Sequence, residues 1–356
     1  MEDKKEMNLD KIDGSKSQSK ETIDEKPFHY KHARANIAVD MVVFGILPEN
    51  KPNSNELCVF VHRPPDESDW WLPGRFMHCG ESIGNEKADD GDNWTLEDTM
   101  KSALTRDEWE VEKSISIKTT SGSKTFSKTS LSKPIYIITP NIDLICQLEA
   151  MSALNRDNRK NKRVVSIPYM TLVCIRENNS IPSELEPDCA QWMPISKLIR
   201  VKDNYTPGEE RLAHDHFDIL KNGLKRLFQE IRTRPIGGNV DMVDDQIINK
   251  YIDNEDRNNK EKLDDYFLLP KEFDISQLVH IYNVVLQTMG VSVERSNLRK
   301  LLLERGVIKE INDNNAPQKG GTTYKFVVEK YNEFKEYLNF GFNPKPKDKN
   351  KTPIIY

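Results

Sequence analysis

The stretch LPKEFDISQLVHIYNVVLQTMGVSVERSNLRKLLLE, residues 269–304, carries the most specific folding signals of the chain. Asp274 is a predicted helix N-cap, and Gln277, three residues later, is its capping-box partner. The apolar residues that follow have the spacing of one buried helix face: Leu278, Ile281, Tyr282 and Val285. Met289-Gly290 ends this helix, and a second helix is predicted from about residue 293 to residue 304.

The second helix has one apolar and one polar face. Its inner residues are Leu298, Leu301 and Leu302, and its outer residues are Arg295, Ser296, Asn297, Arg299 and Lys300. Gly306 breaks the helix. Val307-Ile308 and the alternating Tyr324, Phe326 and Val328 predict a hairpin around the polar loop 312–323. Helix, turn, helix and hairpin together predict a winged helix.

This segment is a candidate partner for double-stranded DNA. In such a fold the second helix enters the major groove with its N-terminal residues towards the base edges, where Asn pairs with adenine and Arg with guanine. Lys319 and Thr322 of the hairpin loop are candidate DNA contacts. Residues 291–330 hold eight Lys/Arg against five Asp/Glu, in a chain whose net charge is −5. The alternatives are a winged helix that contacts only protein, or a basic face that is merely solvated.

The chain before this segment alternates predicted strands and helices. Residues 35–47 and 57–62 are rich in Val, Ile and Phe and predict two strands, and residues 164–175 predict a third. Residues 95–109 and 212–231 predict amphipathic helices. His214 and His216 lie two residues apart on the second of these helices, a spacing that does not make two side chains face each other. We therefore expect packing or capping around Asp215 rather than a metal site.

Trp70-Trp71-Leu72-Pro73-Gly74 with Gly80-Glu81 resembles the start of the Nudix hydrolase signature, whose clustered glutamates hold magnesium. Arg75 stands where the signature has its first glycine, and Glu81 matches its isolated glutamate. Three further motif positions hold Ser102, Ala103 and Arg106. A cation among the remaining acids repels magnesium, so we expect no metal, no cofactor and no enzyme activity. An active hydrolase that uses Glu81 with Asp107, Glu108 and Glu110 is the alternative.

Ordered phrases along the chain are similar to those of the Nudix-related transcriptional regulators, the NrtR-like family. They are IAVDMVVF at 37–44, VHR at 61–63, WLPG at 71–74, NRDNR at 155–159 with RVVSIPY at 163–169, WMP at 192–194, LAHDH at 212–216, LPKEF at 269–273 and SNLRK at 296–300. The resemblance implies an α+β fold class: a Nudix-like α/β/α sandwich with a mixed sheet, followed by a winged helix-turn-helix domain.

The resemblance also implies a function. The Nudix-like domain would sense a metabolite, ADP-ribose or a related nucleotide or sugar, and a homodimer would place two winged helices on a palindromic operator. Arginines bind phosphates well, so the ligand-binding candidates are Arg63, Arg75, Glu81, Arg156 and Arg159. Each arginine could equally serve a surface or packing ion pair.

Composition sets the domain boundaries that we expect. The polar N-terminal residues, with eight acids and six lysines among the first 30, predict a disordered extension over 1–34. The sensor domain then covers 35–232, a linker 233–262, the winged-helix domain 263–342 and a basic tail 343–356. Polar inserts are expected at 84–94 and 119–132.

Five cysteines without a C-x-x-C pair and apolar runs too short for a membrane helix favour a cytoplasmic protein without membrane contact. A third interpretation, a scaffold that keeps both folds but neither activity, stays open beside the regulator and the hydrolase.

Overall fold

The computed structural model describes residues 36–48, 54–64, 67–77, 95–106, 115–119, 122–126, 136–153, 164–175, 190–252, 254–311 and 322–334. The expected N-terminal extension, the insert 84–94 and the basic tail lie outside these residues. None of the helices in the described ranges is long and apolar enough to cross a membrane.

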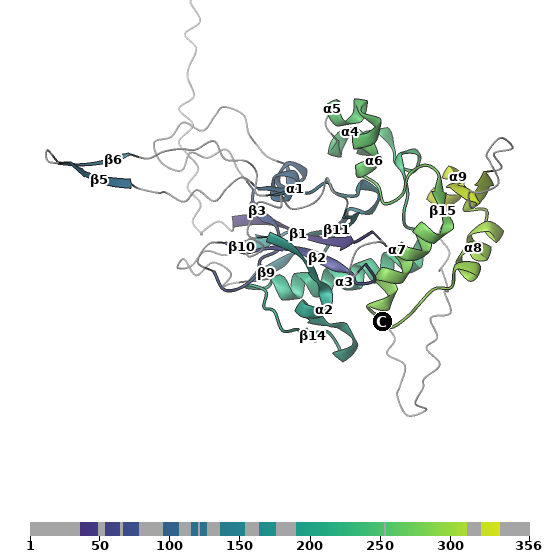
Figure 1. The fold of residues 1–356 in the computed structure, drawn as a ribbon, viewed down its shortest axis with the longest axis horizontal. Coiled ribbons are helices and arrows are strands. Elements are labelled where there is room, and N and C mark those ends of the chain that lie inside the picture. Colours follow the sequence, from purple (N-terminus) through teal and green to yellow (C-terminus); the bar gives the residue numbers. More distant parts are fainter. Residues whose placement is uncertain are drawn as a thin grey trace, which may run out of the picture. The chain divides into compact units, whose positions relative to one another are not determined.

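A mixed eight-stranded sheet is the centre of the fold (Figure 1). The long strand β1 (Asn36–Ile46) pairs in parallel with β10 (Val164–Ser166) and β11 (Tyr169–Cys174). It pairs antiparallel with β2 (Cys58–His62) and β3 (Gly74–Phe76). The other strands pair antiparallel with these: β8 (Cys146–Gln147) with β11, β9 (Met151–Ala153) with β10, and β12 (Ala190–Pro194) with β2. The predicted third strand is thus two strands, β10 and β11.

Two helices cover the two faces of this sheet. Val39, Met41 and Val43 of β1 pack with α1 (Leu96–Leu104), whereas the alternate residues Val42 and Phe44 pack with α3 (His216–Thr233). The backbone of α3 comes so close to the sheet that a Cβ on Gly223 would lie 3.1 Å from the Val42 side chain. These layers confirm the predicted α/β/α arrangement with a mixed sheet.

Both sensor-domain helices differ in length from the prediction. The predicted helix 95–109 ends at Leu104 because Thr105–Arg106 forms β4, which pairs with β7 (Tyr136–Ile137). The predicted helix 212–231 begins only at His216, since His214 has a φ of 51°, which ends regular helix geometry. His214 therefore does not share a helix with His216, and the helical spacing argument was wrong for this pair.

Short elements complete the first part of the chain. They are β5 (Ile115–Thr119), β6 (Gly122–Phe126), η1 (Ile142–Leu144), α2 (Ile195–Leu198), β13 (Ile199–Arg200), η3 (Val201–Asp203) and β14 (Thr206–Pro207). β5 pairs with β6 and β13 with β14.

The segment predicted as a linker contains four short helices: η4 (Val240–Met242), α4 (Asp245–Tyr251), α5 (Asn254–Asn258) and α6 (Lys260–Asp265). Ile236, Ile248 and Ile252 in this segment are buried, so it packs against its neighbours. The predicted domain boundaries themselves stay a prediction.

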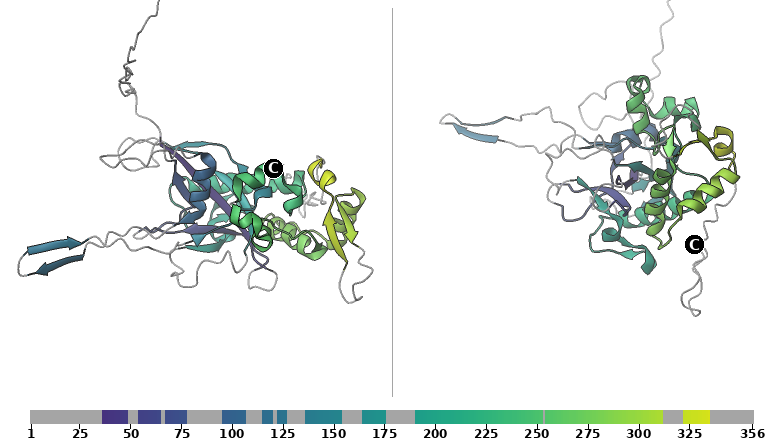
Figure 2. Two further views of the ribbon diagram at one scale, coloured as in Figure 1. Left: turned by 90° about the horizontal axis from the view of Figure 1, so that it is seen from above. Right: turned by 45° about the vertical axis from the view of Figure 1, so that its right-hand side comes forward.

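The C-terminal elements form a winged helix. A three-stranded sheet, in the order β15 (Phe273–Asp274), β17 (Thr323–Phe326), β16 (Ile308–Ile311), packs with α7 (Ile275–Gln287) and α8 (Arg295–Glu304). These strands and helices lie side by side (Figure 2). The Asp274–Gln277 capping box is present, and the predicted inner residues of α7 are buried. One strand assignment was wrong: Val328 begins a helix, α9 (Val328–Asn332), and lies outside the hairpin.

Candidate functional site

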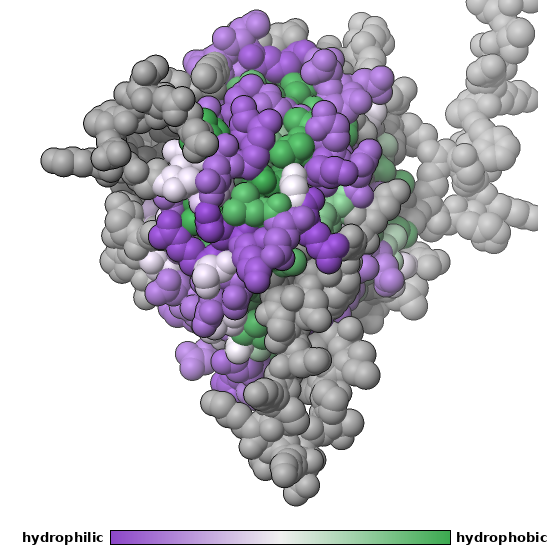
Figure 3. Space-filling view, turned by 90° about the vertical axis from the view of Figure 1, so that its right-hand side faces the viewer, coloured by the Kyte–Doolittle hydropathy of each residue, from purple (hydrophilic) through white to green (hydrophobic). Residues whose placement is uncertain are grey.

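Helix α8 presents a polar face away from the core of the winged helix. Leu298 and Leu302 are fully buried, and Leu301 is half-buried. Of the five DNA-binding residues predicted on α8, Arg299 is half-buried and the other four are exposed: Arg295, Ser296, Asn297 and Lys300. Hydrophilic side chains surround a smaller hydrophobic area on the side of the molecule where α8 and α9 lie (Figure 3).

Acidic side chains form ion pairs and hydrogen bonds with the polar side chains of this face. Arg295 Nη2 lies 3.3 Å from Asp274 Oδ1, and Lys300 Nζ lies 3.8 Å from Glu304 Oε1. Asn297 Nδ2 donates to Glu294 Oε2 over 3.2 Å. Phosphate oxygens of DNA can replace such carboxylates, because both accept hydrogen bonds from the same donors.

Arg299 joins α8 to the hairpin. Its Nε donates to the Tyr324 hydroxyl over 2.6 Å, and its Nη2 pairs with Glu310. Glu310 and Tyr324 are register partners on β16 and β17, so one guanidinium contacts both strands. The Tyr324 hydroxyl and Glu310 raise the pKa of Arg299. Of the two predicted loop contacts, Thr322 is exposed next to β17, and Lys319 lies outside the described residues.

Only two of the five predicted ligand-binding residues can be placed. The guanidinium carbon of Arg63 lies 4.0 Å from the ring centroid of Trp70, and Arg75 Nε donates to the Ser102 carbonyl over 3.4 Å. Both arginines thus make contacts within the protein, the packing role left open by the sequence. Glu81, Arg156 and Arg159 fall outside the part of the chain that the structure describes.

Three positions that depart from the Nudix signature lie at the end of α1 or directly after it. Ser102 is half-buried, and Ala103 is buried against the sheet. Arg106 is in β4. Among the described residues no cluster of three His, Cys, Asp or Glu side chains could hold a metal ion.

The structure brings together a buried polar group that the sequence did not reveal. The Ser166 hydroxyl donates to Asp40, and His216 Nε2 lies 3.7 Å from Asp40 Oδ1. His216 Nδ1 accepts the backbone N–H of Leu72 over 3.0 Å, which makes this nitrogen the unprotonated one. Gly74 leaves room for the Asp40 carboxylate, which a Cβ at position 74 would overlap.

This group fastens the W-L-P-G turn to the sheet and to the start of α3. The ring of Trp71 contacts both His214 and His216, with centroid distances of 4.9 and 5.6 Å. The signal in the sequence was a set of polar residues within apolar phrases: Asp40, Ser166 and His216.

A cavity of about 450 Å³ opens between α2, β13 and η3 on one side and the C-terminal end of α7 on the other. It is lined by Asn55, Glu56, Leu57, Ile195, Ser196, Ile199, Arg200, Val201, Lys202, Asp203, Val284, Gln287 and Thr288. None of the predicted ligand-binding residues lines it. Its cations and acids are balanced, so charge favours neither an anionic nor a cationic ligand.

Comparison with known proteins gives one domain match. Residues 266–326 match the NrtR DNA-binding winged helix domain, and this segment includes α7, α8 and the hairpin. This confirms the predicted C-terminal DNA-binding fold. No curated protein matches the chain.

Solved structures resemble the chain at low sequence identity. A MutT/nudix family protein from Enterococcus faecalis is 15% identical, with a TM-score of 0.45 over 84% of this chain and 89% of that one. Shewanella oneidensis NrtR complexed with a 27mer DNA is 16% identical, with a TM-score of 0.45 over 84% and 96%. The NUDIX domain of the same protein complexed with ADP ribose is 18% identical, with a TM-score of 0.30 over 55% and 90%.

Proposed function

We propose that this chain is a ligand-responsive transcriptional regulator that binds operator DNA through its winged helix and senses a metabolite with the domain built on β1. The match of residues 266–326 to a DNA-binding domain carries this proposal. The exposed face of α8, with Arg295, Asn297 and Lys300, supplies the side-chain types that bind bases and phosphates.

The sensing part of the proposal rests on the sequence phrases shared with Nudix-related regulators. Arg63 and Arg75, with Glu81, Arg156 and Arg159, are the proposed contacts, and ADP-ribose is the first effector to test. To bind a phosphate, the guanidinium of Arg63 would have to leave its position over the Trp70 ring. We further propose that the protein is a cytoplasmic homodimer that binds a palindromic operator.

The proposal includes the loss of hydrolase activity. Alanine at 103 and arginine at 106 stand where the Nudix signature has glutamates, and serine at 102 stands where it has an arginine. We expect no magnesium-dependent turnover of ADP-ribose. Turnover that disappears in a Glu81→Gln variant would instead support the hydrolase.

The experiment is selection of genomic DNA fragments by the purified protein at low salt, with and without ADP-ribose, followed by sequencing. The expected result is a palindromic sequence that the protein enriches without ADP-ribose and no longer binds when ADP-ribose is present. If the protein binds the palindrome equally well with ADP-ribose, the chain is still a DNA-binding regulator but ADP-ribose is not its effector. No enrichment at low salt, where phosphate contacts are strongest, would overturn DNA binding.

Matched variants link the selection to α8. Lys300→Ala removes an exposed lysine of the proposed interface, and Lys197→Ala removes an exposed lysine of α2. We expect only Lys300→Ala to weaken DNA binding and to lower its salt dependence by about one counterion. Equal effects of both variants would indicate nonspecific attraction.

A further inference from the structure

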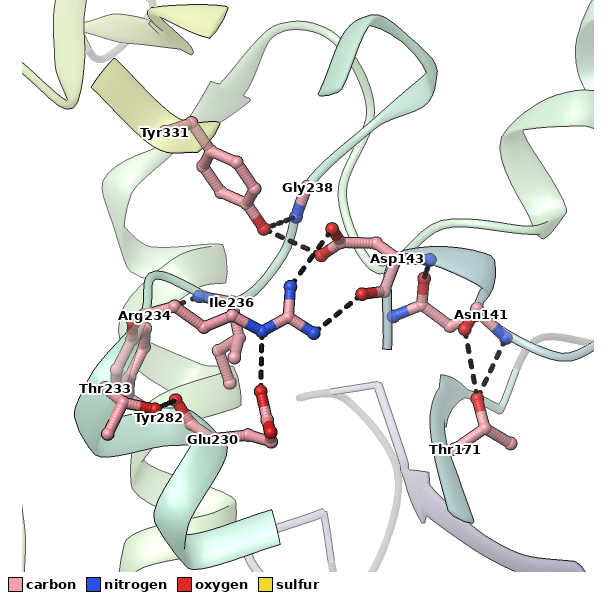
Figure 4. Close-up of polar contacts among 10 residues, drawn as sticks. All are labelled: Asn141, Asp143, Thr171, Glu230, Thr233, Arg234, Ile236, Gly238, Tyr282 and Tyr331. Carbon is pink, nitrogen blue, oxygen red and sulfur yellow. Dashed lines mark hydrogen bonds and ion pairs between the residues drawn. The ribbon is translucent and has the colours of Figure 1, made fainter. Parts of the chain in front are cut away.

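A polar cluster lies where the end of α3 meets η1 and α9, with Arg234 at its centre (Figure 4). Arg234 Nη1 lies 3.3 Å from Asp143 Oδ1, and Arg234 Nη2 donates to the Asp143 carbonyl over 2.7 Å. Arg234 Nε donates to Glu230 Oε2, also over 2.7 Å. One guanidinium therefore binds both the last turn of α3 and the 3-10 helix η1.

Tyr331 of α9 completes the cluster from the other side. Its hydroxyl donates to Asp143 Oδ2 over 2.7 Å and accepts the backbone N–H of Gly238 over 2.9 Å. A Cβ on Gly238 would lie 2.7 Å from the Tyr331 hydroxyl, so glycine is needed for this close approach. The carboxylate of Asp143 thus receives Arg234 on one oxygen and Tyr331 on the other.

The cluster continues into the central sheet. The Asn141 side chain accepts the backbone N–H of Asp143 over 3.1 Å and so caps η1. The Asn141 backbone exchanges two hydrogen bonds with the buried Thr171 hydroxyl of β11, at 3.1 and 3.2 Å. A continuous series of hydrogen bonds therefore leads from β11 through η1 to α9.

The polar side chains of this cluster are largely shielded from solvent. The side chain of Asp143 is 7% exposed, and that of Arg234 is 28% exposed. Burial opposes the charge of Arg234, but Asp143, Tyr331 and Glu230 together raise its pKa. Burial, together with Asp143, raises the pKa of Tyr331 well above its ordinary value, so its hydroxyl stays protonated and can donate. Removing one member leaves a buried charge or polar group without its partner, which is costly.

We infer that Arg234 and Tyr331 are positioning residues that join the sensor sheet and the winged helix into one cooperative unit. Tyr331 lies outside the segment 266–326 that matches the DNA-binding domain, so α9 adds a contact with the sensor to that domain. The inference deepens the proposed function, because an effector in the sensor must reach α8 through elements that move together.

Hydrogen exchange of the full chain tests this inference without DNA or effector. In the natural sequence we expect amides of α7, α8 and β17 to open together with those of β1 and β11. In Arg234→Met, the winged-helix amides should exchange about a hundredfold faster relative to β1 and β11. Tyr331→Phe should give a smaller change of the same kind, about tenfold. The amide of Gly238, which loses its acceptor in this variant, should also exchange faster.

A control variant separates the cluster from general damage. Arg226→Met removes an arginine that pairs with the same Glu230, over 2.6 Å. It should leave the exchange ratio between winged helix and sheet within about twofold of the natural one.

Two results would overturn the inference: the same ratio in Arg234→Met as in Arg226→Met, or a natural chain in which α8 already opens independently of β1. Tyr331→Phe decides the matter if Arg234→Met does not fold. Failure of DNA selection would reject the proposed function and leave this exchange result unaffected.

Discussion

Two histidines of the same phrase differ entirely in their structural roles. His216 is 2% exposed and accepts the backbone N–H of Leu72, whereas His214 is exposed and has a left-handed φ of 51°. A left-handed conformation costs a residue with a side chain about 1 kcal/mol relative to glycine. His216 therefore stabilises the turn, and the backbone of His214 is slightly strained.

Substituting the two histidines should separate these roles. We expect His216→Ala to lower the free energy of unfolding by about 3 kcal/mol, because it leaves a cavity and a buried N–H without its acceptor. His214→Gly should be neutral or stabilising by up to about 1 kcal/mol. Urea unfolding followed by circular dichroism measures both, and equal losses would contradict this assignment.

A second test at the residue scale concerns Glu310, the acid that holds Arg299. Glu310→Gln removes a negative charge beside the proposed DNA surface and frees the guanidinium, so DNA affinity should rise by about three- to tenfold. Fluorescence anisotropy with the selected DNA measures this. Glu329→Gln, an exposed acid on α9, is the matched control and should change affinity by less than about twofold. Weaker binding by Glu310→Gln would show that the acid orients Arg299 for DNA.

At the scale of elements, α7 begins with a complete capping box. Asp274 accepts the backbone N–H of Ser276 over 2.6 Å, and Gln277 accepts the backbone N–H of Asp274 over 2.9 Å. Partial burial opposes ionisation of Asp274, but the hydrogen bonds from Ser276 and the charge of Arg295 lower its pKa. The same carboxylate therefore starts α7 and contacts α8.

The cap predicts a pH-dependent contribution to stability. Asp274→Ala should lower the free energy of unfolding at pH 7 by about 1 kcal/mol. Because the folded pKa is below the ordinary value of 3.8, this contribution is complete above that value and disappears as the pH falls through the folded pKa. Urea unfolding at pH 7 and in acid tests it, with Glu272→Ala as an exposed control. A loss that is constant down to strongly acidic pH would contradict the role of the ionised cap.

At the scale of the whole molecule, one hydrophobic core runs from the sheet into the winged helix. It includes Phe44 of β1, Ile231 of α3, Tyr282 of α7 and Tyr331 of α9. The ring of Tyr331 lies 4.9 Å from that of Phe326. The end of the DNA-binding segment is therefore not the end of its core.

A pair of truncations tests this continuity. A chain that ends at Val327 keeps the whole matched segment 266–326 but lacks Tyr331, and should lose about 3 kcal/mol or more of stability. A chain that ends at Phe334 keeps α9 and should be more stable than the shorter chain by about this amount. Thermal unfolding compares the two. Equal melting temperatures would show that α9 contributes nothing to the core.

The sequence predicted elements that have strong local signals. The helical period of α7 and α8, the Asp274 cap and the alternation of β1 all rest on neighbouring residues. The Asp40–Ser166–His216 group and the Asp143–Arg234–Tyr331 cluster could not be predicted, because their members lie far apart in the sequence. Asp40 and Ser166 are 126 positions apart, and Asp143 and Tyr331 are 188 positions apart. Val328 was misassigned because an apolar residue two positions after Phe326 continues a strand pattern as well as it begins a helix.

The acids around α8 have a consequence for how ionic strength acts on the protein. Each cation that meets a phosphate must first leave Asp274, Glu304 or Glu310, so the protein itself supplies the anions that compete with DNA. Dissolved salt weakens these internal pairs as well as the contacts with DNA. The affinity should therefore fall less steeply with salt than a count of the basic residues on α8 would indicate.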